Sequence, residues 1–317
     1  MLELSLCMAH RHLTLSVVLA VFNEEAHLGA CLESVQGIAD EIVIVDGGST
    51  DKTVSIAKSF KARVIETDNP PIFHINKQKA LDAARGEWVL LLDADERVPP
   101  ELADEILMIV SSKDDDLENH YVDPKKYDLL MRHLALLAAR DGAVGTAEGP
   151  IVAFYMPRRN YFLGKFLTYA GAYPDGTVRL VRKGKARFAL RDVHDQMIID
   201  GQVSVLSHDL IHLADPDFSR YLTRSNRYTS LQAQHWMDAY HKKPNIHEHR
   251  APGIGFFSQL RWMVIAPLAT FFLLFIRHKG FLDGFPGFVW SLYSALHVAT
   301  SYVKYWEMRR QEQLKRR

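Results

Sequence analysis

Two aspartates one residue apart give this sequence its clearest chemical signal. Asp93 and Asp95 come directly after residues 88–92, an apolar run with the length and composition of a buried strand. Ligands of open α/β sheets bind just beyond the carboxyl ends of the strands, so both carboxylates are expected to face one crevice. Two carboxylates placed in this way can share a divalent cation.

The sequence contains two further Asp-x-Asp pairs, Asp114/Asp116 and Asp215/Asp217. Both lie in polar surroundings, and neither is expected to follow a strand. Only Asp93 and Asp95 therefore have the setting of a binding site.

The residues before this pair predict the elements that position it. Apolar runs at 15–21, 42–45, 63–66 and 88–92 alternate with helical patterns, and this alternation predicts an α/β fold with a parallel, doubly wound sheet. Asn23 is expected to cap the first helix. The Gly47-Gly48 pair predicts a tight turn after the second strand, before a helix that begins at 49–51.

The next part of the chain is expected to complete the domain. A helix is predicted from Pro99-Pro100, a surface loop or insertion at 111–128, and a helix at 127–139. Residues 151–213 are expected to be mixed α+β, to cover the carboxyl edge of the sheet and to hold an acceptor. Residues 218–240 are predicted to form a helix.

Composition narrows the class of protein. Lysine plus arginine and aspartate plus glutamate number 38 each, so no global positive field points to nucleic acid as a partner. Cys7 and Cys31 cannot build a disulfide framework, and Cys31 is expected on the apolar face of a helix, which favours a reducing compartment. Residues 1–12 lack the basic and apolar regions of a secretory signal.

Two apolar stretches lie near the carboxyl end. Residues 262–276 are bracketed by arginines and are shorter than the roughly 20 residues that span a bilayer. Residues 281–303 are long enough but contain glycine, proline, aspartate and histidine. Aromatic flanks and the basic tail at 309–317 favour a pair of interfacial or re-entrant helices, which would make the protein monotopic. A buried helical hairpin of a soluble domain is the alternative.

Three ordered motifs resemble those of family 2 glycosyltransferases with the GT-A fold: VVLAVFNEE, IVIVDGGSTDKT and WVLLLDADE. The resemblance covers about residues 13–240. The later segments YPDGTVRLVRKGKARF, DVHD, GFLDGFPGF and KYWE resemble a membrane-associated bacterial branch that includes lipopolysaccharide-core glucosyltransferases. This resemblance implies a nucleotide-sugar-binding half at 13–115, an acceptor-binding and catalytic half at 116–240, and a membrane-associated helical hairpin with its basic tail at 250–310.

The activity that the resemblance implies is an inverting, metal-dependent hexosyl transfer. The donor would be a nucleoside-diphosphate sugar, with UDP favoured, and the acceptor a lipid-linked one, either lipopolysaccharide core or a polyprenyl-linked glycan. The enzyme would work at the cytoplasmic face of a bacterial inner membrane. A catalytically inactive membrane scaffold and a polyprenyl-phosphate glycosyltransferase remain alternatives. A nicotinamide or flavin enzyme is disfavoured, because the turn at 22–25 lacks the Gly-x-Gly-x-x-Gly pattern.

The resemblance also assigns donor-binding residues. Phe22, Asn23 and Glu24 would lie against the nucleoside, although Asn23 is equally a simple helix cap. Asp46 would hydrogen-bond the base, with capping of the Gly47-Gly48 turn as the alternative.

For the metal, Asp95 would ligate Mg²⁺ or Mn²⁺ directly, while Asp93, separated from it by Ala94, would lie near the ribose and the cation. Lys77 could reach phosphate, whereas Lys79 is expected on a solvated face.

The catalytic base is expected to be Asp195, at a position where this branch usually has Glu. Asp192 and Asp175 are possible substitutes. Arg179 and Arg182 could bind phosphate or the acceptor through their planar guanidinium groups, with surface pairing as the alternative. His194 is a further candidate on the phosphate and acceptor side, and neither His194 nor His212 is predicted to ligate a metal.

Overall fold

The computed structural model describes residues 14–70, 72–118, 120, 122–188, 197–215, 217–241 and 251–315, apart from the side chains of 115, 140 and 141. The chain forms two compact units. Unit 1 comprises Met1–Arg158 with Pro174–His212, and unit 2 comprises Arg159–Tyr173 with Leu213–Arg317. The predicted divisions at 13–115, 116–240 and 250–310 stay a prediction.

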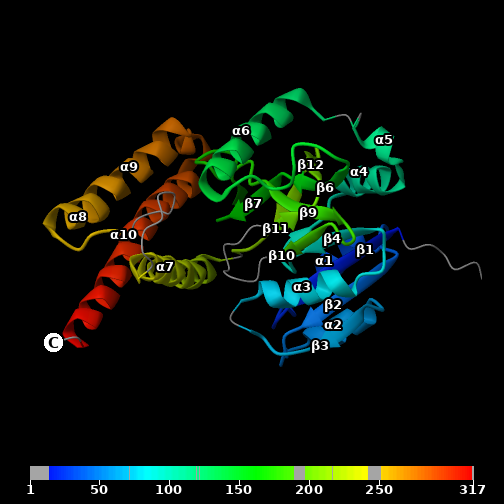
Figure 1. Cartoon of the computed structure of the whole chain (residues 1–317), viewed down its shortest axis with the longest axis horizontal. Coiled ribbons are helices and arrows are strands. Elements are labelled where there is room, and N and C mark those ends of the chain that lie inside the picture. Colours follow the sequence, from blue (N-terminus) through cyan, green and yellow to red (C-terminus); the bar gives the residue numbers. More distant parts are fainter. Residues whose placement is uncertain are drawn as a thin grey trace, which may run out of the picture. The chain divides into compact units, whose positions relative to one another are not determined.

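A seven-stranded sheet forms the centre of unit 1, in the order β12-β6-β9-β4-β1-β2-β3 (Figure 1). β4, β1, β2 and β3 are parallel, whereas β9 is antiparallel to both β4 and β6. The strands are β1 (Leu15–Val21), β2 (Glu41–Asp46), β3 (Arg63–Glu66), β4 (Trp88–Leu92), β6 (Ile151–Met156), β9 (Thr177–Arg182) and β12 (Gln202–Val205). The expected α/β class with a mostly parallel sheet is confirmed.

Helices cover both faces of this sheet. Leu15, Val17 and Leu19 of β1 belong to one apolar cluster with residues of α1 and α4, while Val18 belongs to a second cluster with residues of α3. This alternation is what a strand buried on both faces requires. The helices of unit 1 are α1 (Leu28–Val35), α2 (Thr53–Ser59), α3 (His74–Ala83), α4 (Pro100–Ser111), α5 (Asp114–Leu117) and α6 (Pro124–Asp141).

Two short strand pairs complete unit 1. β5 (Glu96–Arg97) pairs antiparallel with β13 (Leu210–His212), and β10 (Ala186–Phe188) pairs antiparallel with β11 (Met197–Ile199). β13 also precedes Asp215, so the expectation that no strand stands before the Asp215/Asp217 pair is wrong. A strand of three residues leaves no periodic pattern that could predict it.

Two further expectations about local structure are wrong. The N-cap of α1 is His27, whereas Asn23 has a φ of 54° and turns the chain just after β1. Asparagine tolerates this left-handed conformation better than most residues, which is why it suits a turn as well as a cap. The interval 111–128 also contains α5 and the beginning of α6 rather than loop alone.

Unit 2 is mainly helical. Its long helices α7 (Phe218–His241) and α10 (Gly284–Lys315) pack against each other. Between them in sequence, α8 (Phe256–Leu260), η1 (Arg261–Ile265), α9 (Ala266–Phe272) and η2 (Leu273–Arg277) follow one another without a break. The remaining elements are β7 (Arg158–Phe162), β8 (Lys165–Phe166) and η3 (Gly280–Asp283).

The helical run Phe256–Arg277 has 22 residues and is long and apolar enough to cross a membrane, judged by length and composition. It begins before the apolar stretch at 262–276, because Ser258, Gln259 and Arg261 interrupt the hydrophobic pattern without ending the helix. The expectation of a segment too short for a bilayer is therefore wrong. None of its most apolar window is buried within the structure.

Candidate functional site

The loops that follow β1 and β2 are joined to each other at the carboxyl edge of the sheet. The backbone N–H of Asn23 donates to Oγ of Ser49 (2.8 Å), and the N–H of Glu24 donates to Oγ1 of Thr53 (2.8 Å). In return, the N–H of Thr50 donates to Oδ1 of Asn23 (2.8 Å). The motifs containing Asn-Glu-Glu and Asp-Gly-Gly-Ser-Thr-Asp therefore form one connected structure.

Asp46 is buried at the end of β2 and caps its own turn. Its Oδ2 accepts hydrogen bonds from the N–H groups of Gly48 (3.0 Å) and Ser49 (2.9 Å), and its Oδ1 accepts one from the Ser49 hydroxyl (2.5 Å). Gly48 has a φ of +82°, a conformation that favours glycine. These contacts correspond to the capping alternative, and contact with a nucleotide base stays a prediction.

Phe22 lies at the same edge, immediately after β1, with an exposed fraction of 43%. An exposed aromatic ring beside two rigid loops offers a flat apolar surface on which a planar base can stack. Contact between Phe22 and a nucleoside stays a prediction.

Both carboxylate oxygens of Asp93 are held by cations. Nζ of Lys77 lies 2.5 Å from Oδ1, and a guanidinium nitrogen of Arg179 lies 2.5 Å from Oδ2. Burial raises the pKa of Asp93, but Arg179 and Lys77 outweigh it and hold the pKa well below its usual range. Three predicted site residues from α3, β4 and β9 are thus brought together.

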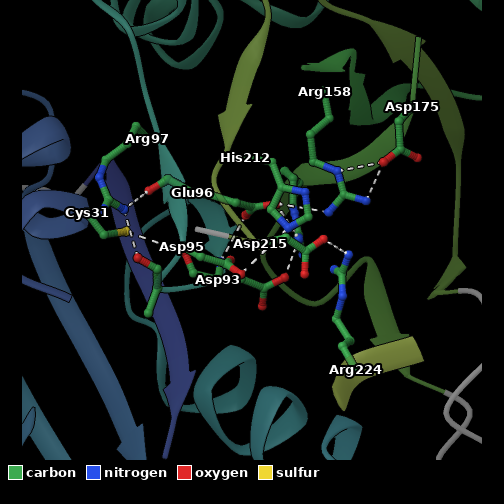
Figure 2. Close-up of polar contacts among 12 residues, drawn as sticks. Cys31, Asp93, Asp95, Glu96, Arg97, Arg158, Asp175, His212, Asp215 and Arg224 are labelled. Carbon is green, nitrogen blue, oxygen red and sulfur yellow. Dashed lines mark hydrogen bonds and ion pairs between the residues drawn. The ribbon is translucent and has the colours of Figure 1, made fainter. Parts of the chain in front are cut away.

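Glu96 contacts both Asp93 and Arg179 and links them to Arg158. It is fully buried, its Oε2 accepts a hydrogen bond from the N–H of Asp93 (2.9 Å), and its Oε1 lies 2.7 Å from Arg179 and 3.3 Å from Arg158. Arg158 in turn pairs with Asp175 at 2.5 Å (Figure 2). Lys77, Arg158 and Arg179 balance the charges of Asp93, Glu96 and Asp175. The roles of Glu96 and Arg158 were not predicted, because no local pattern indicates these contacts.

Asp95 lies beside His212 rather than beside these cations. The pairing of β5 with β13 sets His212 opposite Glu96, and Nε2 of His212 lies 3.7 Å from Oδ2 of Asp95 (Figure 2). Ala94 between the two aspartates is buried, and its carbonyl accepts a hydrogen bond from Arg97 (2.8 Å). His212 was not expected near the acidic pair, because β13 is too short to be seen in the sequence.

Cys31 supports the end of β4 from α1. Its side chain is fully buried, and its Sγ lies 3.5 Å from the carbonyl oxygen of Asp93. Burial raises the pKa of this thiol well above its usual range.

Unit 1 contains a cavity of about 260 Å³. Lys77 and Arg179, the two cations that hold Asp93, line it together with Tyr155. Phe188 and Met197 also line it. These two residues end β10 and begin β11, so they bracket residues 189–196 in the sequence.

Not every predicted residue joins this group. Arg182 lies at the amino end of β4, where it stacks over Trp88 and pairs with Glu87 at 3.3 Å and with Asp114. Its contacts are those of the surface-pairing alternative. Lys79 donates to the hydroxyl of Thr67 (2.6 Å) and stays away from Asp93, as expected.

The assignments of Asp192, His194 and Asp195 lie outside the described residues. Asp175, the other possible base, is already paired with Arg158.

Unit 1 thus defines the protein as a doubly wound α/β protein with loops, cations and carboxylates gathered at the carboxyl edge of its sheet. Residues 16–117 match the model of the family "Glycosyl transferase family 2". The match supports a family 2 glycosyltransferase domain over these residues, which run from β1 to α5.

Curated relatives extend the similarity over most of the chain. A lipopolysaccharide core biosynthesis glycosyltransferase of Rhizobium meliloti, LpsC, is 26% identical over 307 residues, which are 93% of each chain. An uncharacterized glycosyltransferase of Rickettsia bellii is 26% identical over 285 residues, which are 88% of this chain and 81% of the relative.

Among solved structures, a mannosyltransferase of Pyrobaculum calidifontis in complex with GDP-Man and Mn²⁺ aligns over 93% of this chain and 88% of its own, with 13% identity and a TM-score of 0.49. A glucosyl-3-phosphoglycerate synthase of Mycobacterium tuberculosis in complex with Mg²⁺ and uridine diphosphate is 31% identical over 27% of this chain and 35% of its own, with a TM-score of 0.25.

Proposed function

We propose that this glycosyltransferase moves a sugar from a nucleoside-diphosphate donor, with UDP favoured, to a lipid-linked saccharide acceptor, with inversion at the anomeric carbon. One observation carries the proposal: the connected Asn-Glu-Glu and Asp-Gly-Gly-Ser-Thr-Asp loops and the acidic end of β4 meet at one edge of one sheet. The two loops offer an aromatic surface and a hydrogen-bonded turn for a nucleoside. The end of β4 offers charged groups for a diphosphate.

The diphosphate is proposed to bind beside Lys77 and Arg179. Both cations line the cavity in unit 1, and Lys77 is mostly buried rather than solvated. Asp93 is proposed to hold these cations in place and to lie near the ribose. Arg179 is further fixed by Glu96, so its guanidinium is presented in one orientation.

A divalent cation fits at Asp95 better than at Asp93. Among the described residues, no group of three or more His, Cys, Asp or Glu side chains is arranged to hold a metal, and both oxygens of Asp93 are in ion pairs. Asp95 would provide a carboxylate, and Mg²⁺ or Mn²⁺ at nucleotide sites completes its coordination with phosphate and water. His212, 3.7 Å from Asp95, would add an imidazole nitrogen, which departs from the expectation that it ligates no metal. When bound, the ion would stabilise the charge of the departing nucleoside diphosphate.

Asp195 is proposed to take the proton of the acceptor hydroxyl as the hydroxyl attacks. Support comes from its neighbours, because Phe188 and Met197 bracket residues 189–196 and both line the cavity beside Lys77 and Arg179. Asp175 is a weaker candidate, since its carboxylate is already paired with Arg158.

The lipid-linked nature of the acceptor is proposed from two features. The exposed apolar helix Phe256–Arg277 suits attachment to the cytoplasmic face of a bacterial inner membrane, and the curated relative LpsC is described as a lipopolysaccharide core biosynthesis enzyme. Polyprenyl phosphate is the second candidate acceptor. A transfer assay that offers either acceptor with the same donor distinguishes them.

Calorimetric titration of a panel of nucleotide sugars, with and without Mn²⁺, tests the donor site. We expect the wild-type protein to bind one donor at least tenfold more tightly with Mn²⁺, and Asp95→Ala to lose this gain. Asp116→Ala, a change in one of the other Asp-x-Asp pairs, is the matched control and should behave as wild type. An Asp95→Ala protein with the full Mn²⁺ effect would contradict the metal assignment, and a wild-type protein that binds no donor would favour an inactive scaffold.

A further inference from the structure

Unit 2 contains a cavity of about 380 Å³ lined by α7 and α10, within the size range of small-ligand sites. Tyr221, Arg224, Ser225 and Tyr228 line it from α7. Trp290, Ser294 and His297 line it from α10. None of these residues belongs to unit 1, so the cavity is distinct from the donor site proposed above.

One wall of the cavity is a fixed aromatic surface. The ring of Phe162 lies 5.0 Å from that of Tyr221 and 5.4 Å from that of Trp290, and Tyr221 also packs against Phe218 at 5.7 Å. Rings packed on each other in this way keep their orientation when a ligand enters. Tyr228 adds a more exposed ring, with an exposed fraction of 41%.

The remaining lining is polar but carries little net charge. Arg224 is paired with Asp215, which is buried, so its positive charge is already balanced. Its remaining N–H groups can still donate hydrogen bonds. Ser225 and Ser294 contribute hydroxyls, and Oγ of Ser225 lies 3.5 Å from Nδ1 of His297.

A sugar ring matches both the aromatic wall and the uncharged polar groups of this cavity. Its C–H faces are apolar and stack on aromatic rings, while the hydroxyls around its rim both donate and accept hydrogen bonds. A phosphate group fits less well, because among the described residues Arg224 is the one lysine or arginine in this lining, whereas Lys77 and Arg179 both line the cavity in unit 1, and because a phosphate gains nothing from the aromatic wall.

We propose that the cavity lined by α7 and α10 binds uncharged sugar residues of the acceptor glycan. This inference rests on the proposed glycosyl transfer to a saccharide acceptor and adds a place where that acceptor is held. The aromatic wall gives affinity for the ring faces, and the serines, His297 and Arg224 select the hydroxyl pattern.

Tyr228→Ala tests the proposal, because this ring lines the cavity yet is exposed enough to be removed without opening the aromatic cluster. Tyr240→Ala is the matched control: it lies on the same helix, has the same exposed fraction of 41%, and does not line the cavity. The probe is the soluble core oligosaccharide released from lipopolysaccharide by mild acid. Its binding is titrated against the full-length protein in a detergent without a sugar head group.

We expect Tyr228→Ala to bind the oligosaccharide at least tenfold more weakly than Tyr240→Ala and the wild type, with donor affinity unchanged. Equal oligosaccharide affinity in the two variants, or a wild-type protein that binds no oligosaccharide, would overturn the proposal. If the acceptor-site proposal fails in this way but the protein still binds donor and Mn²⁺, the proposed transfer activity is not contradicted. Conversely, a wild-type protein that binds the oligosaccharide through Tyr228 but no nucleotide sugar would support this site and contradict the transfer activity.

Discussion

At the scale of single residues, Asp93 and Asp95 lie in two different environments. Asp93 is locked between Lys77 and Arg179, while Asp95 lies beside an imidazole. The position of both residues at a strand end could be predicted, because an apolar run that stops at carboxylates is visible in the sequence. Their partners could not, since Arg179 and His212 lie on strands distant in sequence and no local pattern indicates which residues they meet.

The prediction for Asp195 belongs to this scale. Asp195→Asn preserves the size of the side chain but removes its ability to accept a proton, so transfer should fall by at least a hundredfold while donor affinity stays within about twofold. Asp209→Asn is the control, because Asp209 is paired at 3.6 Å with Lys126 and does not line the cavity that contains Lys77 and Arg179. Steady-state transfer and donor titration measure the two effects, and near wild-type turnover would assign the base to another residue.

At the scale of elements, the strands were the most predictable part of the fold. The bounds predicted for β1, β3 and β4 agree with those observed, since continuous apolar runs between turn residues leave little freedom. The turn at Asn23 and the short pair β5–β13 were missed. Their geometry depends on hydrogen bonds between distant loops, which sequence periodicity does not record.

Glu105 on α4 gives an element-scale prediction about pH. The residue is buried and accepts hydrogen bonds from His120 (2.8 Å) and from the backbone N–H groups of Ser207 (2.8 Å) and His208 (2.9 Å). Burial raises its pKa, but these hydrogen bonds outweigh burial and lower the pKa to about 2. The ionised carboxylate thus fastens α4 to the segment that precedes β13.

The pKa of Glu105 is lower in the folded than in the unfolded protein. The stabilisation that its carboxylate adds to the free energy of unfolding is therefore complete above the ordinary pKa and is lost as pH falls toward 2. Glu105→Gln should reduce the free energy of unfolding by on the order of 2 kcal/mol at pH 7. The deficit should shrink as pH falls below 4.5. Urea titrations at several pH values measure this, with Glu101→Gln on the exposed face of α4 as control. A deficit that does not change with pH would contradict the assignment.

At the scale of the whole molecule, the chain joins an α/β unit to a helical unit with an exposed apolar run. The sequence could indicate the run through its aromatic and basic flanks, but its length became clear only when the helix was seen to start at Phe256. Deletion of this part is a poor test, since α10 packs against α7 and covers Tyr221 and Met237.

Substitution of exposed side chains tests membrane attachment without opening the core. Phe256 and Phe257 have exposed fractions of 71% and 84%, so Phe256→Ser with Phe257→Ser should leave stability nearly unchanged. We expect this double variant to bind vesicles of anionic lipid at least tenfold more weakly in a flotation assay. Leu136→Ser, at a residue 69% exposed in unit 1, is the control. Equal flotation of both variants would contradict membrane binding by this helix.

The thiol of Cys31 offers a way to observe the donor edge in motion. It is a fully buried residue of α1 that contacts the carbonyl of Asp93, so an alkylating reagent reaches it only when this part of the structure opens. The labelling rate of the peptide containing Cys31 therefore reports the local opening equilibrium of the site, separately from global unfolding. A donor that binds the closed edge slows this labelling in proportion to its occupancy, which makes a native cysteine a sensor of substrate binding.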